Sequence, residues 1–248
     1  MDRNYWERIA YSYNDEIFDV FQNDKTGIIR SAITEYASPA KTVMDIGCAV
    51  GKWIPFLALH FKKVIATDIS SKNIELAKKN CAHIENADYL RADMSDSKLK
   101  IAACDVAVCI NAILTSSLKD RIIFFKSLTK CVRKNGILVL VVPSLESSLY
   151  TSIIRHRWNV DGINRRKKHS LKDYRQKIEN FSQGNIEIDS VPTKHYLKEE
   201  LSLLLSQEKF RTVSFQKVQY NWRTEFLQPP KWLKEPYPWD WLCIARKY

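Results

Sequence analysis

The stretch Val43–Trp53 constrains this chain more than any other part of it. It begins with the apolar residues Val43 and Met44, then turns through Gly47 and Gly51 into an apolar, helix-compatible segment. A strand that ends in a glycine turn presents backbone N–H groups and a helix N-terminus to whatever lies beyond the sheet edge. Glycine has no Cβ, so a ligand can approach such a turn closely. The stretch therefore predicts a ligand site at the end of the first strand of an α/β fold.

Acidic residues mark the predicted ends of three strands in the first half of the chain. Asp45 lies in the first strand, Asp68 ends the apolar segment that starts at Val64, and Asp93 follows the segment that ends near Leu90. An acid about 20 residues after a glycine turn can accept hydrogen bonds from ribose hydroxyls. Asp68 lies 21 residues after Gly47, so it is the predicted ribose ligand.

The glycine spacing separates two classes of cofactor. The dinucleotide fingerprint is G-x-G-x-x-G, whereas the small residues of this chain are Gly47, Ala49 and Gly51. An NAD-dependent oxidoreductase therefore fits the sequence less well.

The three acids, in this order around this turn, resemble the class I S-adenosylmethionine (SAM)-dependent methyltransferases. The resemblance covers residues 1–144 well and the remainder in outline. It implies that the Asp45–Gly51 turn holds the amino-acid end of SAM and that Asp93 and Met94 bracket the adenine. One departure is Ala49, where the family usually has glycine. The cofactor-binding residues implied are Tyr13, Asp45, Gly47, Cys48, Gly51, Trp53, Asp68, Ile69, Asp93, Met94 and Asn111.

Apolar and aromatic residues recur at helical spacing over residues 1–22, which predicts an amphipathic helical region. Packing on the domain explains such a stripe by itself. In the family that the chain resembles, the pattern formed here by Trp6, Ala10 and Tyr13 covers the amino-acid end of the cofactor. The resemblance thus implies a lid in which Tyr13 contacts SAM, while Tyr5 and Trp6 line the acceptor pocket.

Asn111 follows the predicted fourth strand, where α/β sheets place ligands. The side chain is either an ordinary turn residue or a group that faces the methyl-transfer site. The branches of the family that methylate bases and amides carry Asn/Asp-Pro-Pro-Tyr/Phe at this position, and the sequence from Asn111 lacks the two prolines. His195, just before the last predicted helix, is the candidate for a general base, although a core or surface histidine is the commoner outcome.

Two later segments are candidates for the acceptor pocket. Residues 145–195 fit no strand–helix alternation, and residues 155–177 contain nine Lys or Arg and two Asp. This run is either a solvated helical face or a cap that recruits an anionic acceptor. The second segment, residues 222–240, is rich in proline and aromatic residues, and Trp232 and Trp239 are predicted to contact the acceptor.

The predicted fold is a Rossmann-like α/β three-layer sandwich with a mostly parallel seven-stranded sheet. We expect a single domain: an N-terminal helical lid (1–37), a SAM-binding core (38–144), an inserted helical cap (145–195), and a last helix with an antiparallel strand pair (196–248). A length of 248 residues and 45% hydrophobic residues are consistent with one such core.

The composition of the chain bears on its cellular compartment and on the charge of its binding partners. The six cysteines form no C-x-x-C pair, which predicts reduced, buried thiols, no bound metal and a cytoplasmic location. No signal peptide is visible, and no apolar run reaches the ~20 residues of a membrane span. The net charge of +11 favours anionic partners without choosing among them.

The function that these patterns favour is methyl transfer from SAM to a small-molecule acceptor by in-line displacement, without a metal. One alternative is an RNA methyltransferase that uses the basic residues 155–177 for phosphates. No RNA-binding module or interleaved stacking aromatics accompany that run. The other alternative is a SAM-binding protein without catalysis.

Overall fold

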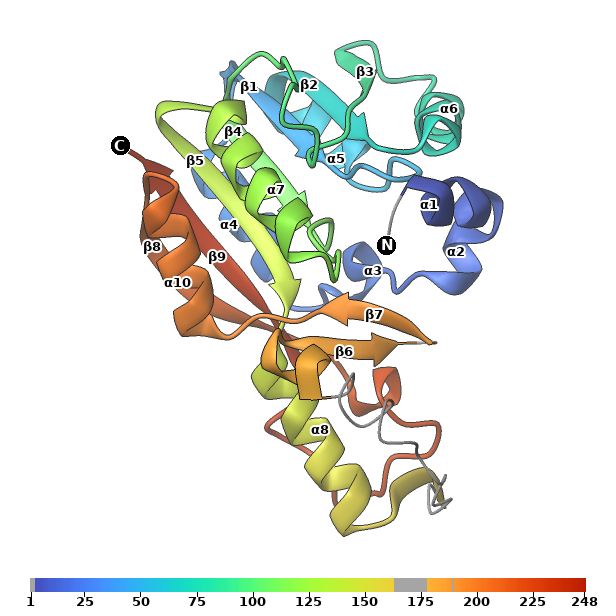
Figure 1. The fold of residues 1–248 in the computed structure, drawn as a ribbon. Helices are drawn as coiled ribbons and strands as arrows, with labels where there is room; N and C mark the ends of the chain where they lie inside the picture. The colour runs from blue at the N-terminus through green and yellow to red at the C-terminus, as the bar shows by residue number, and fades with distance from the viewer. Residues whose placement is uncertain (1–2, 163–177, 189) are drawn as a thin grey trace.

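A mixed β-sheet forms the centre of the molecule in the computed structural model, which describes residues 3–162, 178–188 and 190–248 (Figure 1). Five strands are parallel, and β9 runs antiparallel to both of its neighbours, β5 and β8. The order across the sheet is β3-β2-β1-β4-β5-β9-β8. The strands are β1 (Ser38–Ile46), β2 (Phe61–Asp68), β3 (Ala87–Arg91), β4 (Cys104–Ile110), β5 (Val132–Pro143), β8 (Phe210–Gln219) and β9 (Trp239–Lys247).

The central strands are buried on both faces, which explains their nearly continuous apolar sequences. In β1, Val43 and Met44 have no solvent exposure, and the same is true of Leu138 to Val142 in β5. Helices α4 (Ile28–Tyr36) and α5 (Ile54–His60) pack on one face, through Ile33 and Leu57. Helices α7 (Leu118–Cys131) and α10 (Lys198–Gln207) pack on the other face. The three predicted layers and the mostly parallel sheet are therefore confirmed.

The N-terminal region is a series of short helices rather than one long one: α1 (Arg3–Ile9), η1 (Ala10–Ser12), α2 (Tyr13–Glu16) and α3 (Val20–Asn23). The chain breaks its helical path at Ile17, which adopts an extended backbone after α2. The first two, α1 and η1, contact α6 (Ser71–Asn80), near the carboxyl ends of β1 and β2 (Figure 1).

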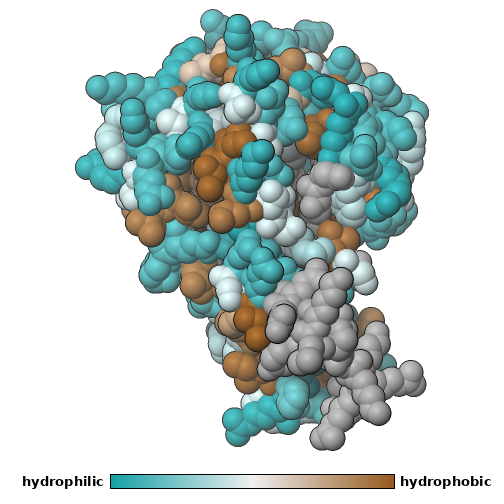
Figure 2. Space-filling view, viewed as in Figure 1, coloured by the Kyte–Doolittle hydropathy of each residue, from teal (hydrophilic) through white to brown (hydrophobic). Residues whose placement is uncertain are grey.

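A second lobe extends from the carboxyl edge of the sheet. It contains α8 (Leu145–Arg157), η2 (Val160–Gly162), η3 (Trp222–Thr224) and the antiparallel pair β6 (Asn185–Ile188) and β7 (Val191–Lys194). A small core of its own holds α8 against η3, through Ile154, Trp222 and Phe226. The outline of the molecule narrows between the sheet and this lobe (Figure 2).

Residues 145–195, predicted as an inserted helical cap, contain the helix α8 and also the β6–β7 hairpin, which was not predicted. Its strands are only four residues long, and one contains Pro192, so no clear period-2 pattern marks them. Tertiary hydrogen bonds hold the hairpin: Lys194 N donates to Leu114 O, and Tyr196 N donates to Pro143 O. The centre of the basic run, residues 163–177, lies outside the described residues.

All six cysteines are buried and unpaired, as predicted. Within the described ranges, no helix is both long enough and apolar enough to cross a membrane.

Candidate functional site

A cavity of about 790 Å³ opens at the carboxyl edge of the sheet. It lies where the strand order reverses between β1 and β4, which is where open α/β sheets bind ligands. One end contacts the glycine turn after β1, and the other extends between the sheet, the N-terminal helices and the second lobe. We call these the cofactor end and the acceptor end.

The glycine turn holds three alternate small residues in left-handed backbone conformations. Their φ angles are 77° at Gly47, 47° at Ala49 and 92° at Gly51. A Cβ at Gly47 would collide with Ala112, so the close approach of two strand exits requires glycine there. Gly47, Cys48 and Ala49 line the cavity. Gly51 lies behind it, against Ala77 of α6 and Cys81, which follows that helix.

Asp45 and Asp68 form an acidic pair at the cofactor end. Burial, and secondly the charge of Asp68, raise the pKa of Asp45 to about 7. Asp45 lies behind the cavity lining, and its Oδ2 atom is buried with no hydrogen-bond partner among the described residues. Asp68 lines the cavity, and burial raises its pKa although three hydrogen bonds oppose this. A cationic group would compensate both carboxylates.

The hydrogen bonds of Asp68 fix its position. Oδ2 accepts from Ala49 N at 3.0 Å, and Oδ1 accepts from Ser70 N at 2.8 Å and from Asn73 Nδ2 at 3.2 Å. The acid at the end of β2 thus holds the glycine turn and the start of α6 together. This orientation is preorganised for hydroxyl ligands that approach from the cavity.

The other residues predicted for the cofactor lie around the same end. Ile69, Asp93, Met94 and Trp53 all line the cavity. Asp93 uses one carboxylate oxygen to accept from Ser95 N at 2.8 Å, which orders the turn after β3. Burial raises the pKa of Cys48 well above its ordinary value, so this thiol is neutral and suited to packing.

The N-terminal helices close the cofactor end. Trp6 and Tyr13 line the cavity, with ring centroids 6.5 Å apart, and Tyr5 lines it beside Trp6. Burial is the main cause that raises the pKa of Tyr13, and the nearby Asp68 adds to it. Lys52 Nζ forms an ion pair with Asp19 Oδ2 at 2.7 Å. The lid thus brings an aromatic surface over the glycine turn.

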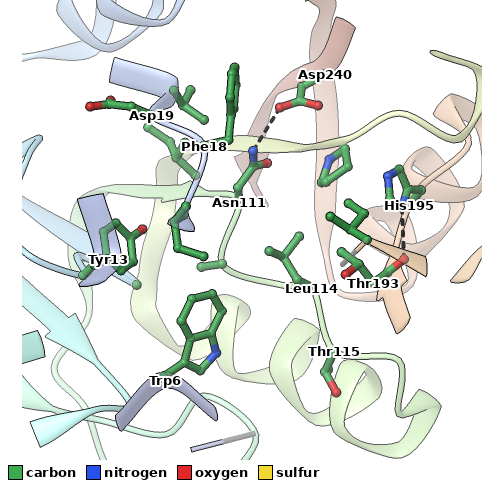
Figure 3. A pocket seen from close by; sticks show the side chains of 18 of the residues that line it. Trp6, Tyr13, Phe18, Asp19, Asn111, Leu114, Thr115, Thr193, His195 and Asp240 are labelled. Carbon is green, nitrogen blue, oxygen red and sulfur yellow. Dashed lines mark hydrogen bonds between the residues drawn. The ribbon is translucent and has the colours of Figure 1, made fainter. Parts of the chain in front are cut away.

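Asn111 lies between the two ends of the cavity (Figure 3). Its φ angle of 46° is left-handed, and its Nδ2 atom donates to Asp240 Oδ2 at 2.9 Å. The same carboxylate oxygen accepts from the Tyr220 hydroxyl, also at 2.9 Å. Asn111 therefore joins the cofactor end to a buried acid of the last strand.

His195 lines the acceptor end opposite Trp6 and Tyr13 (Figure 3). Its Nδ1 atom is 3.0 Å from Thr193 O, so the neutral ring carries its proton on Nδ1 and leaves Nε2 as the acceptor. Burial lowers the pKa of His195, which keeps the ring neutral near pH 7.

The two tryptophans predicted to contact the acceptor lie in different places. Trp239 is 8% exposed and lines the cavity. Trp232 is 54% exposed, lies outside the cavity lining and packs against Trp158, with ring centroids 5.2 Å apart.

Several cavity residues were not predicted, among them Phe18, Arg155, Tyr220, Glu225 and Asp240. Asp240 could have been found from the sequence, because it lies at the beginning of a predicted antiparallel strand. Acids were expected where parallel strands end, but β9 is antiparallel, so its beginning lies at the same edge. Arg155 and Glu225 belong to the second lobe, whereas Phe18 lies between α2 and α3 and Tyr220 follows β8. No local sequence pattern places these four residues in the cavity.

The fold and the site define a Rossmann-like α/β protein with its ligand site at the topological switch point. Residues 43–136 match the protein family described as "Methyltransferase domain". Among solved structures, a SAM-dependent methyltransferase from Anabaena variabilis superposes with a TM-score of 0.65 and 14% identity, over 99% of this chain and 93% of that one. The N-methyltransferase NodS from Bradyrhizobium japonicum, in complex with S-adenosyl-L-homocysteine, superposes with a TM-score of 0.61 and 13% identity, over 99% and 97%. At these identities the superpositions establish the fold.

Sequence relatives are similar over a shorter stretch. A tRNA/tmRNA (uracil-C(5))-methyltransferase of Campylobacter lari is 34% identical over 90 residues, 32% of this chain and 26% of that protein. One from Campylobacter jejuni is 31% identical over 100 residues, 38% of this chain and 27% of that protein. The chain therefore spans about a quarter of the length of these relatives.

Residues 43–136 are therefore similar to a methyltransferase domain, and the superpositions give the chain the fold of SAM-dependent methyltransferases. The match of residues 43–136 agrees with the predicted class of enzyme, and the bound ligand of the NodS structure is the demethylated product of the predicted cofactor.

Proposed function

We propose that this protein transfers a methyl group from S-adenosyl-L-methionine to a small molecule bound at the acceptor end of the cavity. The observation that carries the proposal is the continuity of one cavity from the glycine turn to Asn111 and Asp240. Its volume of about 790 Å³ lies in the ordinary range of sites for small ligands, roughly 300–1,000 Å³. A cofactor and a compact acceptor would share this space.

The residues at the cofactor end fit SAM. Gly47 and Ala49 would let the amino-acid end lie against the turn, and the acidic pair would compensate its ammonium group. Asp68 would accept hydrogen bonds from the ribose hydroxyls, and Asp93 and Met94 would lie beside the adenine. The aromatic rings of Trp6 and Tyr13 would favour a nearby sulfonium cation.

The catalytic contribution of the chain would be mainly positioning. Bound SAM supplies an electrophilic methyl group, and transfer requires a nucleophile aligned with it. The N-terminal helices and the β6–β7 hairpin would exclude water from the space around the nucleophile and the methyl group. Orientation and desolvation of these groups would lower the activation barrier of methyl transfer. His195 remains a candidate base for an acceptor that arrives protonated.

A second candidate is RNA methylation, which the two uracil methyltransferase relatives favour. The basic residues of the 155–177 run that the structure describes are Arg155 and Arg157, in the last turn of α8. Arg155 already binds another part of the chain, because its Nη2 atom donates to Glu225 O at 2.6 Å. The size of the cavity, which suits a cofactor together with a compact acceptor, is the reason to prefer a small acceptor.

The test begins with calorimetry of S-adenosylhomocysteine and SAM. We expect Asp68→Ala to weaken both by about 1.5–3 kcal/mol, because it removes a charged hydrogen-bond acceptor. Unchanged affinity would remove the ribose assignment, and no binding by the wild-type protein would overturn the proposal. A salt titration of RNA binding separates the second candidate, because phosphate contacts give a steep dependence on salt.

A further inference from the structure

Asp240 is the most deeply placed acid at the acceptor end. It is the second residue of β9, where it pairs with Pro143 of β5 and Val218 of β8. It is 9% exposed, and it lines the cavity together with Asn111 and Tyr220. A carboxylate in such a place is costly unless it is hydrogen-bonded or meets a cation.

The two oxygens of Asp240 have different roles. Oδ2 accepts from Asn111 Nδ2 and from the Tyr220 hydroxyl, each at 2.9 Å. Oδ1 accepts from no donor in the described part of the chain. One oxygen is therefore held by two donors, while the other is left for a ligand in the cavity that Asp240 lines (Figure 3).

The charges around this carboxylate are predominantly negative. Glu225 also lines the acceptor end. Burial raises the pKa of Glu225, and the charge of Asp240 adds to this effect, while the charge of Arg155 opposes it. Arg155 is a cation that lines the acceptor end, and it lies beside Glu225. Lys52 is paired with Asp19 at the cofactor end, and His195 is held neutral. No cation among the described residues is paired with Asp240.

Aromatic rings form the walls beside Asp240. Phe18 packs edge-on against Tyr220, with ring centroids 4.9 Å apart, and Trp239 precedes Asp240 in β9. All three line the cavity. Aromatic faces next to a carboxylate are a favourable environment for an ammonium group. Lys217 Nζ already lies over the Trp239 ring, 3.7 Å from its centroid, so Phe18 and Tyr220 are the rings proposed for the ligand.

Polar atoms without partners extend the site beyond Asp240. At this end of the cavity, four donors or hydroxyls are buried with no hydrogen-bond partner among the described residues. They are Thr151 Oγ1, Arg155 Nε, Thr224 Oγ1 and Trp239 Nε1. A ligand with its own oxygen atoms would satisfy them.

We propose that the acceptor is a compact amine that carries oxygen substituents, and that Asp240 is the catalytic residue that binds its nitrogen and takes its proton. This inference rests on the proposed methyltransferase function. It differs from the anionic acceptor that the basic run suggested. Asn111 and Tyr220 are positioning residues, because they hold Oδ2 and leave Oδ1 for the amine.

The proton and electron balance is complete without another reactant. The ammonium form of the acceptor gives one proton to Asp240 Oδ1 and becomes the neutral amine. The nitrogen lone pair of the amine then forms a bond to the methyl carbon supplied by SAM, whose C–S bond breaks with its electron pair on sulfur, which leaves S-adenosylhomocysteine. Burial raises the pKa of Asp240, although Asn111 and Tyr220 oppose this, so the carboxylate is a better proton acceptor than an exposed one.

The binding test uses the full chain saturated with S-adenosylhomocysteine. The probes are compact hydroxylated primary and secondary amines, each with the alcohol and the carboxylate of the same carbon skeleton, and binding is followed by saturation-transfer NMR. We expect amines to bind at least tenfold more tightly than their matched partners. We expect Asp240→Asn to lose that preference while S-adenosylhomocysteine binding stays within twofold. Asp88→Asn removes one exposed acid of β3 outside the cavity and is the charge-matched control.

The kinetic test uses an amine identified in that series and measures kcat/KM against pH. Tyr220→Phe removes one hydrogen bond that stabilises the charged form of Asp240, so the acidic limb of the profile should move to higher pH. A merely structural role would leave the limb in place. Wild-type protein that binds S-adenosylhomocysteine but no amine, or Asp240→Asn that keeps the amine preference, would overturn this proposal and leave methyl transfer intact. Failure of the wild type to bind S-adenosylhomocysteine would instead overturn the proposed function.

Discussion

The backbone N–H of Ser71, the first residue of α6, donates to Oε1 of Glu7 in α1 at 2.9 Å. Glu7 Oε2 also accepts from Lys72 N at 3.2 Å and from Ser70 Oγ at 3.1 Å. A carboxylate from the lid thus caps the N-terminus of a helix in the core. Helix N-termini favour negative charge, so this contact stabilises the closed position of the lid.

Glu7→Ala is expected to weaken binding of S-adenosylhomocysteine about fivefold. Loss of an N-terminal capping contact costs about 1 kcal/mol, and 1.4 kcal/mol is about tenfold in affinity. Calorimetry measures the change, and Asp15→Ala, at an exposed acid of α2, is the matched control. Equal affinities for the two variants would show that the lid does not depend on Glu7.

The same contact has a defined pH dependence. Burial acts to raise the pKa of Glu7, but hydrogen bonds from the Ser71 and Lys72 backbone and nearby side chains outweigh it and hold the pKa below 4.5. A lowered folded-state pKa means that the contribution is fully present above 4.5 and is lost as the pH falls through the lowered value. The difference between wild type and Glu7→Ala should therefore be constant near neutral pH and shrink below pH 4.5.

Local sequence patterns were sufficient to predict the strands and the ligand-binding edge in the first half of the fold. The central parallel strands β1, β4 and β5 contain apolar runs, and the glycine turn and Asp68 lie at strand exits whose position follows from the chain direction alone. The carboxyl ends of parallel strands share one edge, so residues as far apart as Gly47 and Asn111 could be placed on one cavity.

The acceptor end depends on contacts that no local pattern records. Asn111 and Asp240 are 129 residues apart, and their hydrogen bond exists because β9 inserts antiparallel between β5 and β8. The β6–β7 hairpin is fixed by a bridge between Thr115 and Thr193. The exposure of Trp232 likewise follows from packing of the second lobe, which its aromatic, proline-rich sequence does not determine.

Ala49→Gly should stabilise the protein by about 1 kcal/mol. Alanine at a φ of 47° has left-handed strain of roughly 1–2 kcal/mol, and glycine removes it at a smaller cost in unfolded-state entropy, about 0.4–1 kcal/mol. Denaturant unfolding measures the change. Ala66→Gly, at a buried position within β2, is the control and should destabilise. Destabilisation of both variants by similar amounts would show that the turn is not strained by its methyl group.

Chelation should leave methyl transfer unchanged. The sulfonium of SAM leaves as a neutral thioether, so the reaction needs alignment of the nucleophile rather than Lewis-acid activation. Among the described residues, no group of three His, Cys, Asp or Glu side chains has the arrangement of a metal site. The assay compares initial rates with and without EDTA. A rate that falls with EDTA and returns with one divalent ion would contradict this prediction.

Trp239 and Trp232 offer a matched pair for the acceptor pocket, because both were predicted to contact the acceptor and only Trp239 lines the cavity. Phenylalanine is the better replacement, since truncation of a buried tryptophan to alanine costs about 3–5 kcal/mol of stability. Trp239→Phe removes the Nε1 donor, which has no partner among the described residues. If the acceptor uses this donor, the variant should lose about 1–3 kcal/mol of acceptor binding. Its affinity for S-adenosylhomocysteine should be unchanged.

Trp232→Phe is the control, and it should leave acceptor KM and cofactor affinity unchanged, because the Trp232 side chain is 54% exposed and packs on Trp158. Steady-state KM for the acceptor and calorimetry of S-adenosylhomocysteine distinguish the roles. A Trp239→Phe variant that loses cofactor affinity and thermal stability together would identify Trp239 as a packing residue. A rise in acceptor KM in Trp232→Phe alone would place the acceptor outside the cavity, next to Trp158 on the second lobe.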